Sequence, residues 1–153
     1  MEKLLIFFWA MYIGIVILVA IIDMNKKIIP NIFTLSLILL GIIYNYIYFG
    51  SIERSIIGGG VFASPFLLIY GYGYDFFKKE CLGFGDVKFI FAIGCFLGYT
   101  DLYSFLIFIN GIFTIALIVV LLFFKKIKKN QEIPFAPFIS FMAIIYPILE
   151  GFI

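Results

Sequence analysis

The feature of this chain that most limits how it can fold is a series of apolar runs, each about as long as a membrane is thick. A helix that crosses the hydrocarbon core needs about 20 mostly apolar residues. Among the 153 residues we find six such candidates. Their approximate bounds are Leu4–Ile22, Ile32–Phe49, Ser55–Tyr74, Phe84–Tyr99, Leu102–Phe124 and Pro134–Phe152. The connections leave no room for a soluble domain, so we predict one membrane-embedded domain over residues 1–153, an all-α polytopic bundle of about six transmembrane helices.

The composition excludes the main classes of soluble protein. Hydrophobic residues make up 65% of the chain and charged residues 13%, whereas a soluble domain is about half apolar and about a quarter charged. A chain with so few polar side chains cannot cover its own surface in water. A soluble enzyme, a disordered tail and a nucleic-acid-binding domain are therefore excluded, and the formal net charge of +2 is too small to indicate a polyanionic partner.

Few side chains are available for metal or cofactor chemistry. The chain has no histidine, and its two cysteines, Cys81 and Cys95, are far apart and lie among apolar residues. Both are best interpreted as small buried hydrophobic residues. We therefore predict neither a cofactor nor a metal.

The distribution of lysines predicts the orientation. One set of connections carries Lys26, Lys27, Lys78, Lys79, Lys125, Lys126, Lys128 and Lys129. The opposite set carries Arg54, with Lys3 near the amino terminus. We predict a multi-pass protein of the plasma (inner) membrane. Because basic residues accumulate in cytoplasmic loops, we expect the lysine-rich connections on the cytoplasmic side and both termini on the outer side.

Two aspartates are hard to explain as solvated surface groups. The other acidic residues lie in loops, at helix edges or near the termini: Glu2, Glu53, Asp75, Glu80, Asp101, Glu132 and Glu150. Asp23, in contrast, directly follows the first apolar run, and Asp86 lies at the start of the fourth. An ionisable group at such a depth is costly and indicates a functional site.

The predicted topology puts Asp23 and Asp86 at the same depth on the same membrane face, so packed helices can bring them together. Two neighbouring carboxylates do not easily both ionise, and they share one proton. The ionised member can take a proton from water while the protonated member polarises a carbonyl. On spacing alone, an ion-binding or packing role for the pair stays open.

Glycines flank the second aspartate. Gly83 and Gly85 have no side chains, so the backbone there can bend and approach another chain closely. A peptide that is to be cut must lie extended beside the acids. The glycine-flanked segment would give its backbone access to them. A simple loop-to-helix junction is the alternative.

Three segments, in order, resemble the type IV prepilin peptidases. Asp23 to Asn31 reads Asp-Met-Asn-Lys-Lys-Ile-Ile-Pro-Asn and resembles the first-aspartate motif of that family. Residues 83–88 read Gly-Phe-Gly-Asp-Val-Lys and match the family's Gly-x-Gly-Asp-x-Lys. Residues 133–138, Ile-Pro-Phe-Ala-Pro-Phe, resemble its late Pro-Phe-x-Pro-Phe segment.

The resemblance implies a membrane aspartic endopeptidase with Asp23 and Asp86 as catalytic acids. Members of the family remove the short basic leader of prepilins and pseudopilins on the cytoplasmic side, after a Gly and before a hydrophobic helix. The implied partners are therefore the amino-terminal segments of such substrates and membrane lipid. No oligomeric state is predicted.

The chain departs from the longer members of the family in its first cytoplasmic connection. Those members carry a zinc-binding domain there, with paired CxxC motifs, that is linked to methylation of the new amino terminus. Here the connection is a few residues long and contains no cysteine. We expect peptidase activity without N-methylation.

Four further residues near the acids receive supporting roles. Lys88 is two residues past Asp86 and should point away from it on a helix, either toward the headgroups or toward a substrate carboxylate. Lys27 could face Asp23 if the helix continued, but Pro30 favours a helix end. Pro30 and Asn31 are expected to form a turn and a possible helix cap.

Two other functions use the same residues. A small ion or proton carrier would bind its ion at the aspartates, and a non-catalytic membrane assembly subunit would tolerate Asp→Asn at both positions. A presenilin-like protease shares Gly-x-Gly-Asp, but Ile22 precedes the first acid here and no Pro-Ala-Leu segment is present. Small residues in the third span are expected to serve internal packing: Gly58, Gly59, Gly60, Ala63 and Ser64.

Overall fold

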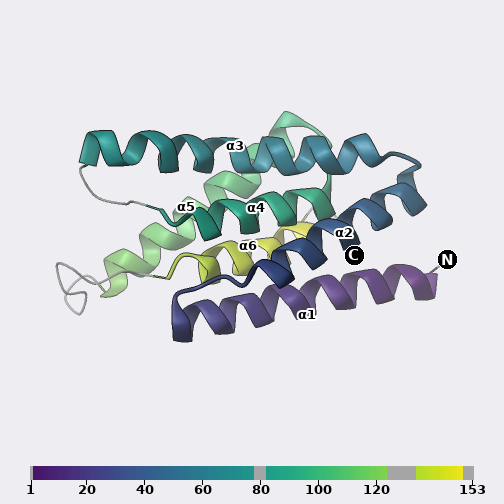
Figure 1. The fold of residues 1–153 in the computed structure, drawn as a ribbon, viewed down its shortest axis with the longest axis horizontal. Helices are drawn as coiled ribbons and strands as arrows, with labels where there is room; N and C mark the ends of the chain where they lie inside the picture. Colours follow the sequence, from purple (N-terminus) through teal and green to yellow (C-terminus); the bar gives the residue numbers. More distant parts are fainter. Residues whose placement is uncertain (1, 78–81, 124–133, 150–153) are drawn as a thin grey trace.

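In the computed structural model, which describes residues 2–77, 82–123 and 134–149, the elements are six α-helices (Figure 1). They are α1 (Glu2–Lys26), α2 (Asn31–Phe49), α3 (Ile52–Phe77), α4 (Phe84–Leu97), α5 (Leu102–Phe123) and α6 (Ala136–Leu149). Each coincides with one predicted apolar run. The prediction of an all-α membrane bundle is confirmed. Within the described ranges, four helices are long and apolar enough to cross a membrane by length and composition: α1, α2, α3 and α5.

Successive helices run in alternating directions. The ends of α1, α3 and α5 and the starts of α2, α4 and α6 lie at one end of the bundle, on the left of Figure 1. We call this the acid end, because Asp23 in the last turn of α1 and Asp86 in the first turn of α4 both lie there. Of the lysines used above to predict orientation, Lys26 and Lys27 belong to this end. Lys78, Lys79 and the lysines at 125, 126, 128 and 129 lie outside the described residues.

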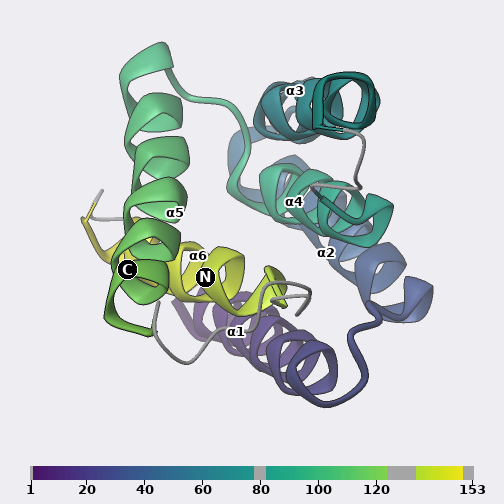
Figure 2. The ribbon, with the colours of Figure 1, turned by 90° about the vertical axis from the view of Figure 1, so that its left-hand side faces the viewer.

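Helix α4 occupies the middle of the bundle. It packs against α2, α3 and α6, and Figure 2 shows it between α2 and α3, with α5 crossing at a steep angle on the far side of α6. Nine of its 14 residues are buried, and a helix that is apolar all round is expected to be enclosed. Its length of 14 residues corresponds to roughly 21 Å at the standard rise, less than the roughly 30 Å of hydrocarbon. Both ends of α4 can therefore lie below the membrane surface, provided that protein groups satisfy their polar atoms.

The carbonyls that end α4 receive such partners from its neighbours. The carbonyl of Cys95 accepts hydrogen bonds from Asn45 Nδ2 (3.1 Å) and Ser55 Oγ (2.5 Å), and the carbonyl of Phe96 accepts from Asn45 Nδ2 (3.0 Å). Asn45 belongs to α2 and Ser55 to α3, and both are fully buried. The last turn of a helix leaves its carbonyls without partners inside the helix. These two side chains supply the donors and so allow α4 to end inside the bundle.

Glycines let α2 and α3 approach α4 closely. A Cβ atom on Gly41 would lie 2.6 Å from backbone atoms of Cys95 and Phe96, and one on Gly59 would lie 2.6 Å from Cys95 Sγ. Of the small residues predicted to pack internally, Gly58, Gly59 and Ala63 are buried, as expected. Gly60 and Ser64 are exposed, so that prediction is wrong for them.

Hydrogen bonds along α1 set the register of α6. Tyr12 Oη donates to the carbonyl of Ala143 (3.1 Å), and Ser140 Oγ donates to the carbonyl of Val16 (3.3 Å). Tyr12 and Ser140 are both buried. Polar side chains that cross between helices at this depth have no water to replace their partners. The two bonds therefore fix which turn of α6 lies beside which turn of α1.

The close packing of α2 on α4 predicts a difference between two glycine substitutions. Gly41→Ala places a Cβ against backbone that cannot turn aside, and overpacking of this kind costs about 1–3 kcal/mol. Gly60→Ala is the matched control, because nothing lies within 4 Å of the added atom and alanine favours the helix. We expect Gly41→Ala to lower the midpoint of thermal unfolding in detergent and Gly60→Ala to leave it unchanged or raise it. Equal midpoints would contradict the packing.

Candidate active site

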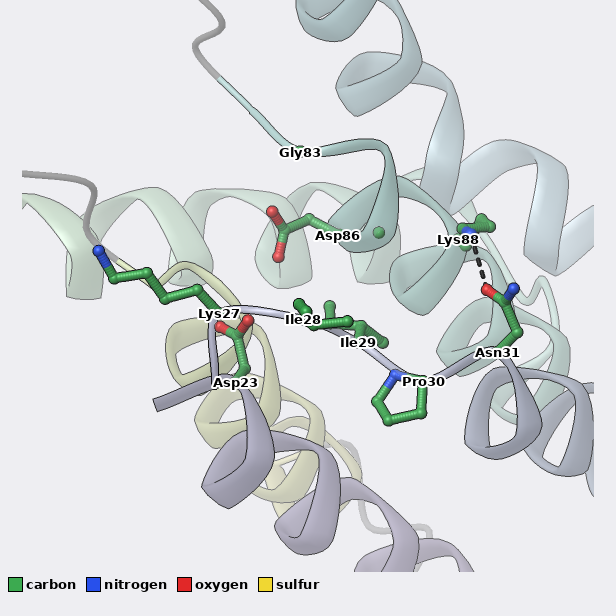
Figure 3. A pocket seen from close by; sticks show the side chains of 10 residues that line it. Asp23, Lys27, Ile28, Ile29, Pro30, Asn31, Gly83, Asp86 and Lys88 are labelled. Carbon is green, nitrogen blue, oxygen red and sulfur yellow. Dashed lines mark hydrogen bonds between the residues drawn. The ribbon is translucent and has the colours of Figure 1, made fainter. Parts of the chain in front are cut away.

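The lining of one pocket at the acid end includes all eight residues that the sequence predicts for the site, namely the two aspartates and the six residues near them. Its volume is about 510 Å³, and the lining consists of Asp23, Lys27, Ile28, Ile29, Pro30, Asn31, Gly83, Gly85, Asp86 and Lys88. The two carboxylates face one another across the opening between the end of α1 and the start of α4 (Figure 3). Two acids that are 63 positions apart in the chain thus contribute to one polar hollow.

Asp23 is the more enclosed acid by surface exposure. Its side chain is 5% exposed, and its Oδ2 accepts a hydrogen bond from the backbone N–H of Ala136 (3.3 Å). Ala136 is the first residue of α6, where backbone N–H groups have no partner within the helix and the helix dipole favours negative charge. The start of α6 therefore provides a fixed donor for this carboxylate. The residue pattern did not predict this contact, because its donor is a main-chain group.

Asp86 is half-buried and lies in the first turn of α4. Gly83 is the N-cap, with extended backbone, and its carbonyl accepts a hydrogen bond from the N–H of Asp86 (3.1 Å). A Cβ atom on Gly83 would lie 3.3 Å from Asp86 Oδ2, whereas one on Gly85 would meet only Ile29, at 3.5 Å. A side chain at 83 would thus crowd the carboxylate, and a methyl group at 85 would make an ordinary van der Waals contact.

The end of α1 is set by a left-handed residue. Lys27 has φ +53° and donates its backbone N–H to the carbonyl of Asp23 (2.8 Å). A residue of this conformation after the last turn commonly ends a helix, and α1 ends at Lys26. The helix end expected before Pro30 is therefore confirmed. In Figure 3 the ammonium group of Lys27 extends away from the two carboxylates.

The opposite wall of the pocket is held by a contact between α2 and α4. Lys88 Nζ donates to Asn31 Oδ1 (2.7 Å) and lies 5.3 Å from the centre of the Phe84 ring. Lys88 points away from Asp86, as expected (Figure 3). The possible helix cap at Asn31 is wrong: Pro30 is the N-cap of α2, without a side-chain cap bond, and Asn31 is the first helical residue. Its side chain instead links α2 to α4.

Three other carboxylates whose side chains the structure describes differ from this pair. Glu2, Glu53 and Asp101 are exposed, and hydrogen bonds from Ser104 and Thr100 hold the pKa of Asp101 below its ordinary value. Asp101 lies at the other end of the bundle, in the connection from α4 to α5. Glu80, Glu132 and Glu150 fall outside the described residues, as does Cys81. Cys95 is a buried free cysteine. Among the residues whose placement is described, no group of three or more possible metal ligands forms.

The arrangement has the chemical requirements for hydrolysis. Two carboxylates share one hollow, one enclosed and one half-exposed, and exposed residues such as Lys27 and Ile28 line its entrance, so water can reach the acids. A pair of this kind can hold one proton between its members. It can therefore act on one reacting group as base and acid together.

Comparisons with known proteins agree on one family. A family model described as the type IV leader peptidase family matches residues 10–121. Leader peptidase HopD of Escherichia coli is 31% identical over 140 residues, which are 87% of this chain and 86% of that protein. No solved structure gives a significant match.

Longer relatives match as well. The prepilin leader peptidase/N-methyltransferase of Pectobacterium carotovorum subsp. carotovorum is 26% identical over 145 residues, 92% of this chain and 50% of that protein. The protein of the same name from Legionella pneumophila is 30% identical over 137 residues, 87% of this chain and 46% of its own length. The chain thus spans about half the length of these relatives.

The link between Asn31 and Lys88 predicts a coupled pair of substitutions. Asn31→Ala and Lys88→Met each remove one partner, so the double variant should lower the midpoint of thermal unfolding no further than either single variant. The coupling should be about 0.5–1 kcal/mol, because the bond is charge-assisted but solvent-exposed. Asn31→Asp, which keeps an acceptor for the ammonium group, should remain close to wild type. Strictly additive single effects would show that the bond contributes nothing.

Proposed function

Because the chain belongs to the type IV leader peptidase family, we propose that it is a membrane aspartic endopeptidase that removes the leader from prepilins or pseudopilins. In this proposal Asp23 and Asp86 are the catalytic residues, within one membrane-embedded domain. The observation that carries it is the position of both carboxylates in the lining of a single pocket, one from α1 and one from α4.

The proposed reaction is addition of water to an amide carbonyl. One aspartate, ionised, takes a proton from the attacking water, and the other, protonated, gives its proton to the carbonyl oxygen. The resulting tetrahedral diol is neutral. When it collapses, the C–N bond breaks, the first aspartate protonates the leaving nitrogen, and the second takes a proton back from a diol hydroxyl. Both carboxyls return to their starting states, as is required of a pair that acts as base and acid in turn.

The pocket lining supports an extended substrate. Glycines at 83 and 85 form the wall beside Asp86, where a substrate backbone can approach without meeting side chains. Ile28 and Pro30 provide apolar surface across the same hollow. We propose that cleavage follows a Gly of the substrate, with the basic leader outside the bundle and the hydrophobic segment after the scissile bond in the membrane.

The charge pattern and the fold support a cytoplasmic reaction. The acid end is where the lysine-rich connections begin and end, and basic connections face the cytoplasm. Both termini would then lie outside an inner membrane. The four residues between α1 and α2, numbers 27–30, leave no place there for a zinc-binding domain, so the proposed activity is that of the peptidase without N-methylation.

Substitution of the acids tests the proposed function. Asp23→Asn and Asp86→Asn should each abolish cleavage of a prepilin in detergent, as read by the mass of the products, because an amide cannot exchange a proton in these steps. The loss should be at least about 1,000-fold, comparable to losses on removing central catalytic groups elsewhere. Asp101→Asn is the matched control, since this acid lies at the far end of the bundle and accepts only local hydrogen bonds.

Three outcomes would contradict the proposed function. Near-normal cleavage by either Asp→Asn variant would exclude the pair as the catalytic centre. Absence of cleavage by the wild-type protein, with ion flux through vesicles that depends on Asp23 and Asp86, would identify an ion carrier. Pilus assembly that tolerates both substitutions would indicate a non-catalytic assembly subunit.

A further inference from the structure

We propose that α6 is the positioning element of the catalytic pair, and that the main-chain N–H of Ala136 holds the Asp23 carboxylate in its working orientation. This inference rests on the proposed function and adds a residue to it. Asp23 Oδ2 accepts from Ala136 across 113 positions of sequence. With Oδ2 engaged, Oδ1 is the oxygen left to face water in the pocket.

The local sequence explains why one N–H is available at this place. Pro134 precedes the helix and Pro137 is its second residue, and proline has no N–H. The N–H groups of Phe138 and Ile139 both donate to the carbonyl of Phe135, at 3.1 and 3.4 Å. The Ala136 N–H is therefore the donor of this first turn that points to another helix. The Pro-Phe-Ala-Pro-Phe segment, whose role the catalytic mechanism leaves unexplained, gains a physical function.

The rest of α6 keeps this donor at the correct height. Ala136 is fully buried, and the bonds from Ser140 to Val16 and from Tyr12 to Ala143 fix the axial position of α6 on α1. These two bonds and the one from Ala136 to Asp23 make three hydrogen bonds along one seam between the two helices. A shift by one turn would move the N–H about 5.4 Å, beyond hydrogen-bond reach.

Asp86 is held differently, so the two acids are not equivalent. Its carboxylate lies over Gly83, in the segment that begins its own helix. Asp23 depends on a donor from a helix more than 100 residues further along the chain. A disturbance at the start of α6 should therefore act on the pair through Asp23.

The charged groups around Asp23 define what a pH profile would report. Lys27 follows on its own chain segment, and Asp86 and Lys88 face the same pocket from α4. From α6, the group that contacts Asp23 is the backbone amide of Ala136, which carries no charge. A donor to a carboxylate favours the ionised form, so its removal should shift the acidic limb of the profile to higher pH.

Removal of this single N–H tests the proposal. Ala136→Pro deletes it at the first position of a helix, where proline is tolerated, and Ala136→Val keeps it while adding at least as much bulk. We expect Ala136→Pro to lower kcat for a prepilin about 10–100-fold with little change in KM. We also expect its acidic limb to move up by about one pH unit, and Ala136→Val to keep the wild-type limb.

Two results would overturn the inference. One is a folded Ala136→Pro protein with wild-type kcat and pH profile, and the other is a shift in Ala136→Val equal to that in Ala136→Pro, which would assign the effect to crowding. Thermal unfolding in detergent shows whether Ala136→Pro is folded. If it is not, replacement of Ala136 by lactic acid removes the N–H alone and must shift the acidic limb of the pH profile to higher pH. Asp23→Asn and Asp86→Asn, measured in parallel, separate the two proposals. Near-normal cleavage in either of them ends the proposed function, whereas inactivity of both together with a normal Ala136→Pro ends only this inference.

Discussion

A polar group at membrane depth must find its partner inside the protein, and the structure at both ends of α4 follows from this constraint. At the far end, Asn45 and Ser55 reach from α2 and α3 to the carbonyls of Cys95 and Phe96. Because these carbonyls are satisfied, a helix of 14 residues can be enclosed between the longer helices α2 and α3. Close contact with α2 and α3 is possible because Gly41 and Gly59 have no side chains.

The same constraint shapes the acid end. The start of α4, where Asp86 lies, is set back from the ends of α3 and α5 (Figure 1), and the start of α6 supplies a donor for Asp23. The carboxylates are thereby held in a hollow of about 510 Å³ between α1 and α4 rather than in bulk water. In such surroundings two like charges repel more strongly than in water. In the proposed mechanism, this repulsion favours the state in which the pair shares one proton.

Much of this architecture could be predicted from the sequence, because hydropathy and charge act locally. The apolar runs predicted the six helices of the described residues to within a few residues, and the position of Asp23 and Asp86 at one end of the bundle followed from where two runs end and begin. Contacts between distant segments could not be predicted in this way. The Lys88–Asn31 bond joins residues 57 positions apart, and a cap at Asn31 was the expectation that local chemistry favoured. The Ala136 donor is a main-chain atom, so no residue type marks it, although the prolines on either side of it were visible.

The proposed function depends on a fold that brings Asp23 of α1 and Asp86 of α4 face to face, and chemical cross-linking can measure this proximity. The variant for this test has its native cysteines removed by Cys81→Ser and Cys95→Ser and carries Asp23→Cys and Asp86→Cys. It would be treated in the membrane with a short bismaleimide. A protease site inserted at Gly50 and Ser51 then separates unlinked halves. We predict that the halves stay joined for this pair and part for the control pair Asp23→Cys with Asp101→Cys, whose members lie at opposite ends of the bundle. Separation of the halves in the Asp23–Asp86 pair, or joining in the control, would contradict this placement of the two acids.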